Sequence, residues 1–164
     1  GLTLPFTFVF YGTGYTDLWM SVNGWLSFGA DPATAAWNNG SLPHTDAPHQ
    51  AAYAFWDDLV YSTSTHPDAA LVYATQGSAP QRVFVAEWFA MRALGTGAEH
   101  RISFQIKLYE GTNVIEFIYD RGTWAGTDYE AAICIEDDAQ TEAVQVGGNF
   151  EVTPPSQDLR FTPN

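Results

Sequence analysis

Apolar and polar residues alternate with a period of two along most of the chain. Clear examples are Phe6, Phe8 and Phe10; Val83 and Val85; Ile102, Phe104, Ile106 and Leu108; and Ile115, Phe117 and Tyr119. Side chains of a strand point alternately to its two faces, so this pattern predicts strands with one buried face. Further short apolar runs, separated by turn residues, bring the expected number of strands to about ten. No segment keeps a helical period, so we expect an all-β fold, an antiparallel β-sandwich of jelly-roll-like architecture.

Residues 15–29, YTDLWMSVNGWLSFG, are predicted to form a β-hairpin. A two-residue Asn23-Gly24 loop would place apolar and polar side chains on the same face. A three-residue loop over residues 22–24, with Gly24 in the left-handed region, separates the faces instead. It pairs Ser21 with Trp25, Met20 with Leu26 and Leu18 with Phe28. We therefore expect Leu18, Met20, Leu26 and Phe28 to point into the core.

The other face of this hairpin carries Trp19 and Trp25 beside Ser21 and Ser27. In a half-buried antiparallel sheet this face meets solvent or a ligand, and rigid tryptophan rings suit stacking on a sugar or anchoring a protein. The alternative is that a helix, a loop or a neighbouring domain covers the face. Trp37, Trp124 and Tyr129 are expected in loops and complete the candidate ligand-binding set. Trp56 and Trp88 interrupt apolar strands and are expected in the core.

The composition restricts the partners of the protein. A chain of 164 residues suits a single domain, here residues 1–164, which we expect to be excised from a larger multidomain protein. Six basic residues against 19 acidic ones give a formal charge of −13, which argues against binding nucleic acid or anionic membranes. No apolar run is long enough to insert across a membrane. The one cysteine, Cys134, lies in an apolar run and is expected to be buried.

Two acidic clusters follow predicted strands. Asp57 and Asp58 could converge with Asp68 on a Ca²⁺ ion, because carboxylate oxygens are the ligands that this ion prefers. The alternative is that one of the aspartates caps the following turn while the other is solvated. Residues 136–138, EDD, are interpreted as a solvated turn.

A hydrolytic enzyme would need paired carboxylates, and the candidates are Glu87 and Glu116, each inside an apolar strand. The simpler interpretation is that both are outward-facing strand glutamates. The sequence contains no nucleophile elbow, zinc-protease motif, phosphate-binding loop or dinucleotide fingerprint. We therefore expect a protein that is not an enzyme.

Several motifs occur in an order that resembles the extracellular nidogen-like (NIDO) domain and its bacterial relatives. These are LPFTFVFYGTGY, SVNGWLSFG, AAYAFWDDL, VFVAEWFAM, ISFQIKLYEG and NVIEFIYD. The resemblance implies a noncatalytic β-sandwich module of secreted or cell-surface multidomain proteins. The first hypothesis is thus an extracellular accessory or adhesion module that binds a glycan or a protein partner through its aromatic face. A structural spacer or assembly domain, packed on neighbouring domains of the parent chain, is the alternative, and a glycoside hydrolase is the third.

Overall fold

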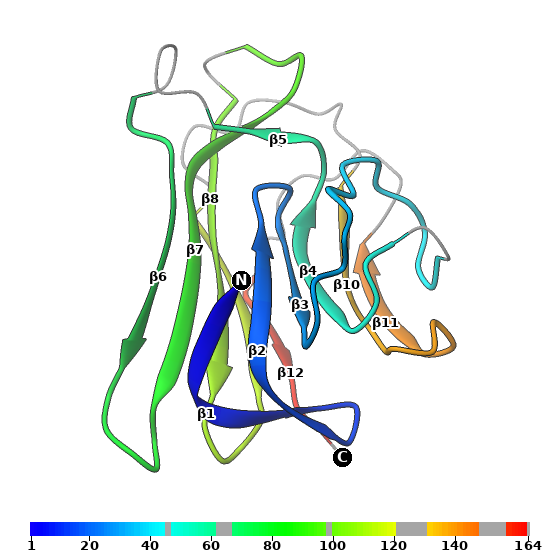
Figure 1. Ribbon diagram of the computed structural model, residues 1–164. Coiled ribbons are helices and arrows are strands. Elements are labelled where there is room, and N and C mark those ends of the chain that lie inside the picture. Colours follow the sequence, from blue (N-terminus) through cyan, green and yellow to red (C-terminus); the bar gives the residue numbers. More distant parts are fainter. Residues whose placement is uncertain (45–46, 62–66, 98–99, 121–130, 148–156, 164) are drawn as a thin grey trace.

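The computed structural model describes residues 1–44, 47–61, 67–97, 100–120, 131–147 and 157–163, and within them the fold is all-β (Figure 1). Twelve strands in these described ranges form two antiparallel sheets. The first sheet has the order β1 (Leu2–Phe10), β2 (Thr13–Ser21), β3 (Trp25–Phe28), β4 (Ala51–Trp56), β10 (Ala132–Glu136), β11 (Ala143–Gly147). The second has the order β12 (Leu159–Phe161), β9 (Ile115–Asp120), β8 (Ile102–Tyr109), β7 (Val83–Ala93), β5 (Leu59–Val60), and β6 (Ala70–Gln76) also pairs with β7. The predicted sandwich is confirmed, and it is open rather than a closed barrel.

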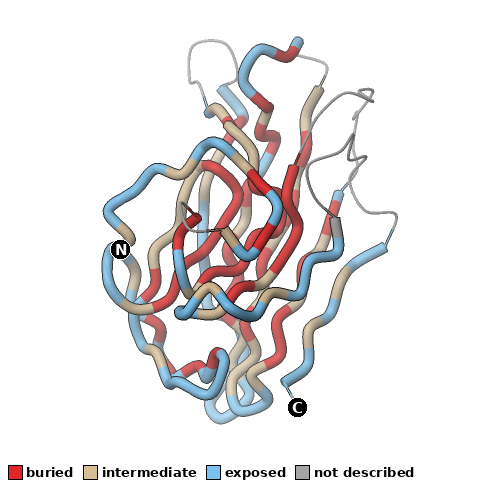
Figure 2. Tube along the Cα trace, turned by 90° about the vertical axis from the view of Figure 1, so that its right-hand side faces the viewer, coloured by how far each residue is buried: buried red, intermediate tan, exposed pale blue. Residues whose placement is uncertain are grey.

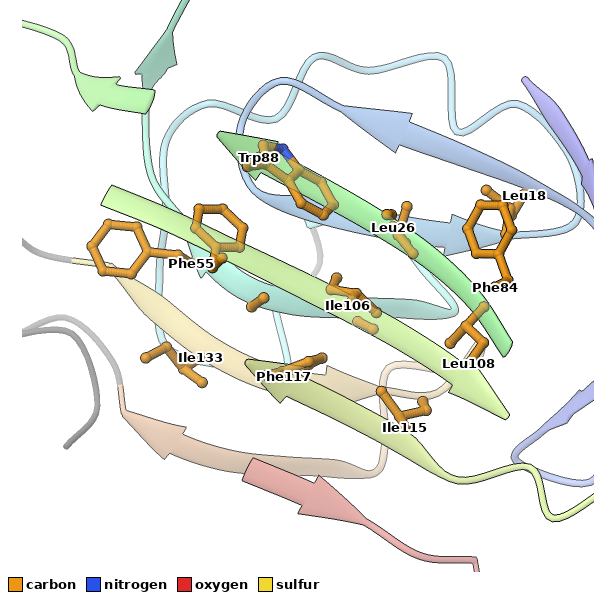
Figure 3. Packing of buried hydrophobic residues seen from close by; sticks show 14 of the residues in the cluster. Leu18, Leu26, Phe55, Phe84, Trp88, Ile106, Leu108, Ile115, Phe117 and Ile133 are labelled. Atoms are coloured by element: carbon orange, nitrogen blue, oxygen red, sulfur yellow. The ribbon is translucent and has the colours of Figure 1, made fainter. Parts of the chain in front are cut away.

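The main core lies between the two sheets (Figure 3). Strand β8 shows how the sequence builds it, since Phe104 and Ile106 are buried while Gln105 between them is partly exposed. Trp88 is fully buried, as predicted, and stacks on Phe104 with ring centroids 5.0 Å apart. Its indole Nε1 donates a hydrogen bond to the Ser21 carbonyl at 2.8 Å, so the ring links the two sheets. Figure 2 shows the buried residues running through both sheets, while connections are largely exposed.

The hairpin formed by β2 and β3 has the predicted register. Leu18 pairs with Phe28, Met20 with Leu26, and Ser21 with Trp25. Gly24 closes the three-residue loop with a φ of 83°, a conformation that favours glycine because it lacks a Cβ. Alternation along two short strands, together with one turn residue, was therefore enough to predict this register.

The chain itself covers the outer face of the first sheet over β3, β4 and β10. Residues 30–50, of which 45–46 are not described, form an irregular segment that we call the strap. Its Leu42 and Ala47 join a second apolar cluster with Trp25, Tyr53 and Trp56. Other members of this cluster are Ala51, Ala132 and Cys134. The burial predicted for Trp56 and Cys134 is confirmed.

Hydrogen bonds hold the strap on this face. The indole Nε1 atoms of Trp25 and Trp56 both donate to the carbonyl oxygen of Ala36, at 3.3 and 2.6 Å. The side-chain amide of Asn23 donates to the Ala35 carbonyl at 2.8 Å. Buried indole N–H groups need acceptors, and the strap backbone supplies them.

A buried carboxylate anchors the other end of the strap. Glu136 is 0% exposed, and its Oε1 accepts a hydrogen bond from the backbone N–H of His44 at 2.9 Å. Its Oε2 lies 3.4 Å from the hydroxyl of Tyr53. Burial raises the pKa of Glu136 above its usual range. The interpretation of residues 136–138 as a solvated turn is therefore wrong for Glu136, because the strap covers this strand end. It holds for Asp137, whose carboxylate caps the turn by accepting from the N–H groups of Thr141 and Glu142.

Candidate functional site

One member of the predicted tryptophan platform, Trp25, is not accessible to a ligand. Trp25 does point to the outer side of the hairpin, but it is only 2% exposed because the strap lies over it. The expectation that it meets solvent is wrong. Trp19, on the same side of β2, is partly buried, and Trp37 lies on the strap with 57% of its surface exposed. Trp124 and Tyr129 lie outside the described residues.

Two of the three aspartates of the predicted calcium site, Asp57 and Asp68, have other contacts. Asp57 Oδ1 accepts the backbone N–H of Asp58 at 2.7 Å, as in the turn-capping alternative. Asp68 forms an ion pair with Arg101. In the part of the chain that the structure describes, no group of three or more His, Cys, Asp or Glu side chains is placed to hold a metal ion. The calcium prediction therefore gains no support from these side chains.

The two candidate catalytic glutamates lie on the outer face of the second sheet, as the simpler interpretation expected. Glu87 of β7 is in register with Gln105, whereas Glu116 of β9 is in register with Lys107. The Glu116 carboxylate accepts a hydrogen bond from the Tyr109 hydroxyl at 2.5 Å and pairs with Arg160. Neighbouring side chains thus engage Glu116 in a cross-strand contact, which is a structural role.

A cavity of about 410 Å³ opens at one end of the sandwich. The β1–β2 turn, the β8–β9 turn, strand β11 and the end of β12 surround it, and Figure 1 shows the β1–β2 turn beside the C-terminal end. Its walls include the rings of Tyr11 and Phe161, the apolar Val144, and the polar Asn113 and Glu142. A concave, largely apolar surface with a few polar groups is typical of ligand sites.

The turn that presents Tyr11 has an unusual backbone. Phe10 pairs with Thr13, so Tyr11 and Gly12 form a two-residue loop with φ angles of 44° and 80°. Such a loop favours Asn-Gly, because a bulky residue at positive φ is strained. Tyr11 is 39% exposed as a residue. Its ring packs edge-on against Phe10 with centroids 4.8 Å apart, and its hydroxyl donates to the Ile135 carbonyl at 3.4 Å. An exposed aromatic ring held at a strained position is a reason to suspect a functional role.

The polar groups of the cavity favour ligands that are not anionic. Asn113 Oδ1 accepts the backbone N–H of Val9 at 2.9 Å, and its amide nitrogen has no hydrogen-bond partner among the described residues. Burial, followed by the nearby Cys134, Asp137, Glu142 and Glu136, raises the pKa of Tyr11 to about 12. The phenol therefore stays protonated at neutral pH, and the carboxylates give the cavity a negative potential.

Sequence reasoning did not identify this cavity as a site. The available signal was the Tyr-Gly pair at a tight turn, where Asn-Gly would form the turn with less strain. The other walls come from residues more than 100 positions away, and only the fold brings them to this turn.

These features define the chain as an antiparallel β-sandwich module with one outer face partly covered by the strap and an open-ended cavity. The family comparison matches residues 1–160 to the family described as NIDO related, and the chain belongs to that family. This family is a non-enzymatic module type and indicates an extracellular domain. Neither the curated proteins nor the solved structures gave a match. Among the described residues, no helix has the length and apolar character needed to cross a membrane.

Proposed function

We propose that the chain is a noncatalytic extracellular accessory or adhesion module that binds a glycan at the Tyr11 cavity. One observation carries the proposal: a single concave surface contains the exposed ring of Tyr11, the Asn113 amide nitrogen, which has no partner among the described residues, and the Glu142 carboxylate. A sugar ring has an apolar face that suits the Tyr11 ring, and hydroxyl groups at its edge that suit Asn113 and Glu142.

The charge of the site narrows the class of glycan. Glu142 lines the cavity and the whole domain carries a formal charge of −13. Sulfated or uronic acid polymers would be repelled, whereas neutral or amino-bearing sugars would not. The proposed ligand is therefore a glycan of neutral or amino-bearing sugars. Its proposed site differs from the hairpin face that the sequence predicted.

The test is calorimetric titration of the domain with neutral, amino-bearing and anionic polysaccharides, using Tyr11→Asn and Trp37→Ala variants. Asparagine suits the positive φ of the turn, so Tyr11→Asn removes the ring without straining the backbone. Loss of a central aromatic anchor costs about 1–2 kcal/mol or more, which corresponds to at least roughly fivefold weaker binding. Trp37→Ala is the matched control, because it removes an exposed ring outside the cavity.

Binding of a neutral or amino-bearing polysaccharide that depends on Tyr11 and not on Trp37 supports the proposal. Equal affinity of the Tyr11→Asn variant, or tighter binding of the anionic polymers, contradicts it. Absence of binding throughout the panel also contradicts it and favours the alternative role as a spacer or assembly domain.

A further inference from the structure

We propose that the free edge of β6 binds an extended, lysine-bearing segment of a partner protein, which adds as a further strand to the second sheet. This inference goes beyond the proposed glycan site, since it concerns a different surface. Strand β6 pairs with β7 over its whole length, from Ala70 opposite Phe89 to Gln76 opposite Val83. No strand among the described residues pairs with its other side. In Figure 1 it is the outermost strand, with no ribbon beyond it.

The β6 edge lacks the features that usually protect a sheet edge. Natural edge strands are short, or carry charged residues or proline, because unpaired backbone groups otherwise recruit another chain. Three of the other edges follow this rule, since β1 contains Pro5 and β12 and β5 have three and two residues; β11, with five uncharged residues, is shorter than β6. Strand β6 has seven residues, and residues 69–81 contain no proline except Pro80 and no charged side chain.

The side chains along this edge provide apolar contacts on both faces. Val72 is 46% exposed on the outer face, in register with Glu87. Tyr73 points to the opposite face, where its ring packs on Phe84 at 6.0 Å while 58% of the residue remains exposed. Phe89, in register with Ala70 at one end of β6, is 44% exposed. An added strand with alternating side chains would contact Val72 on one face and Tyr73 on the other.

Charge decides between the possible occupants. A second copy of the chain would bring another formal charge of −13 to the edge. Glu87 has no hydrogen bond or ion pair with the described residues, and it lies one strand in from the edge, beside Val72. An added strand would lie about 4.8 Å beyond β6, and so about 9.6 Å from β7. A lysine opposite Val72 can extend its chain over the valine and bring its ammonium group to Glu87. The complementary occupant is therefore a basic extended segment.

The probe is an end-capped eight-residue peptide of alternating lysine and valine, studied with the whole 164-residue domain. Hydrogen exchange followed residue by residue should show slower exchange of β6 amides when the peptide is added. The same peptide with N-methyl groups on alternate backbone nitrogens should not bind, because strand addition relies on backbone hydrogen bonds. Glu87→Lys should weaken binding of the lysine peptide by about two- to fivefold, the range of an exposed ion pair. The glutamate–valine version of the peptide should bind this variant better than it binds the wild type.

Asp31→Lys is the matched control, because it also reverses the charge of a carboxylate but lies exposed on the strap, over the other sheet. It should leave peptide binding unchanged. Equal binding of the N-methylated peptide, protection outside β6, or insensitivity to Glu87→Lys would each overturn the proposal. A domain that sediments as a dimer with β6 already protected would overturn it too, because the occupant would then be a second copy. None of these results depends on the glycan measurements.

Discussion

Replacing Gly24 with alanine should destabilise the protein strongly, because this glycine is the point where the β2–β3 loop approaches β4. Its carbonyl accepts the N–H groups of Ala54 and Phe55, at 3.1 and 3.3 Å. A Cβ atom on residue 24 would lie 1.9 Å from the carbonyl oxygen of Phe55 and 2.7 Å from its carbonyl carbon. Both are backbone atoms that cannot rotate away, so the hairpin and β4 would have to separate.

Two costs add in this variant. An alanine at a φ of 83° pays about 1–2 kcal/mol for the left-handed conformation. Moving packed backbone apart adds about 1–3 kcal/mol, the usual range for overpacking. The expected loss is about 2–5 kcal/mol, out of the roughly 5–15 kcal/mol that stabilises a typical domain.

Gly12→Ala is the matched control. Gly12 has a φ of 80°, and a Cβ built on it has no atom within 4 Å, so this variant pays only the conformational cost. Urea unfolding followed by tryptophan fluorescence gives the free energy of unfolding for both variants and the wild type. Gly24→Ala should be less stable than Gly12→Ala by about 1–3 kcal/mol. If the two variants lose the same free energy, the close approach at Gly24 does not limit stability and the reasoning is refuted.

Three further outcomes are expected. The raised pKa of Glu136 means that its stabilising contribution is present below about pH 4.5 and is lost as the pH rises through its folded value. In thermal melts, the Tm of Glu136→Gln relative to the wild type should therefore rise with increasing pH. A Tm difference that stays constant with pH would contradict a raised pKa of the buried Glu136. The hydrogen bond from Arg82 lowers the pKa of Glu110 from 4.5 to about 2, so its contribution is present above pH 4.5 and is lost as the pH falls towards 2. Glu110→Gln should lower Tm at pH 6 and converge with the wild type in acid; equal Tm values at pH 6 would argue against this ion pair. Millimolar Ca²⁺ should leave Tm unchanged, because Asp68 is paired with Arg101. A rise in Tm on addition of Ca²⁺ would contradict this expectation and favour the calcium site predicted from the sequence.

Burial of Trp88 and the β2–β3 register show where sequence reasoning succeeds. Both depend on alternation along a strand, and this periodicity is local, since neighbouring side chains must point to opposite faces. The outward position of Glu87 followed from the same alternation. The order of the family motifs also predicted a β-sandwich of the NIDO type. The family match over residues 1–160 agrees with that prediction.

Trp25 and Glu136 show where it fails. Alternation places Trp25 on the outer face, but it contains no information on what lies above that face. The strap that covers it is irregular and follows no period, so its contacts with Trp25 and Trp56 are visible only in three dimensions. Glu136 looks like part of a polar strand end, but the strap covers it, and the backbone N–H of His44, 92 residues away, donates a hydrogen bond to the buried carboxylate.

Alternation of apolar and polar side chains specified most of the strands and their buried faces, and Gly24 specified the β2–β3 turn, because both are local properties of the chain. Tertiary contacts set which faces remain open. The strap covers Trp25 on the outer face of the hairpin. Turns that are far apart in the chain meet to form the Tyr11 cavity, and the order of strands in the second sheet leaves β6 at an edge. Exposure depends on contacts between segments far apart in the chain, and a local pattern cannot specify those contacts.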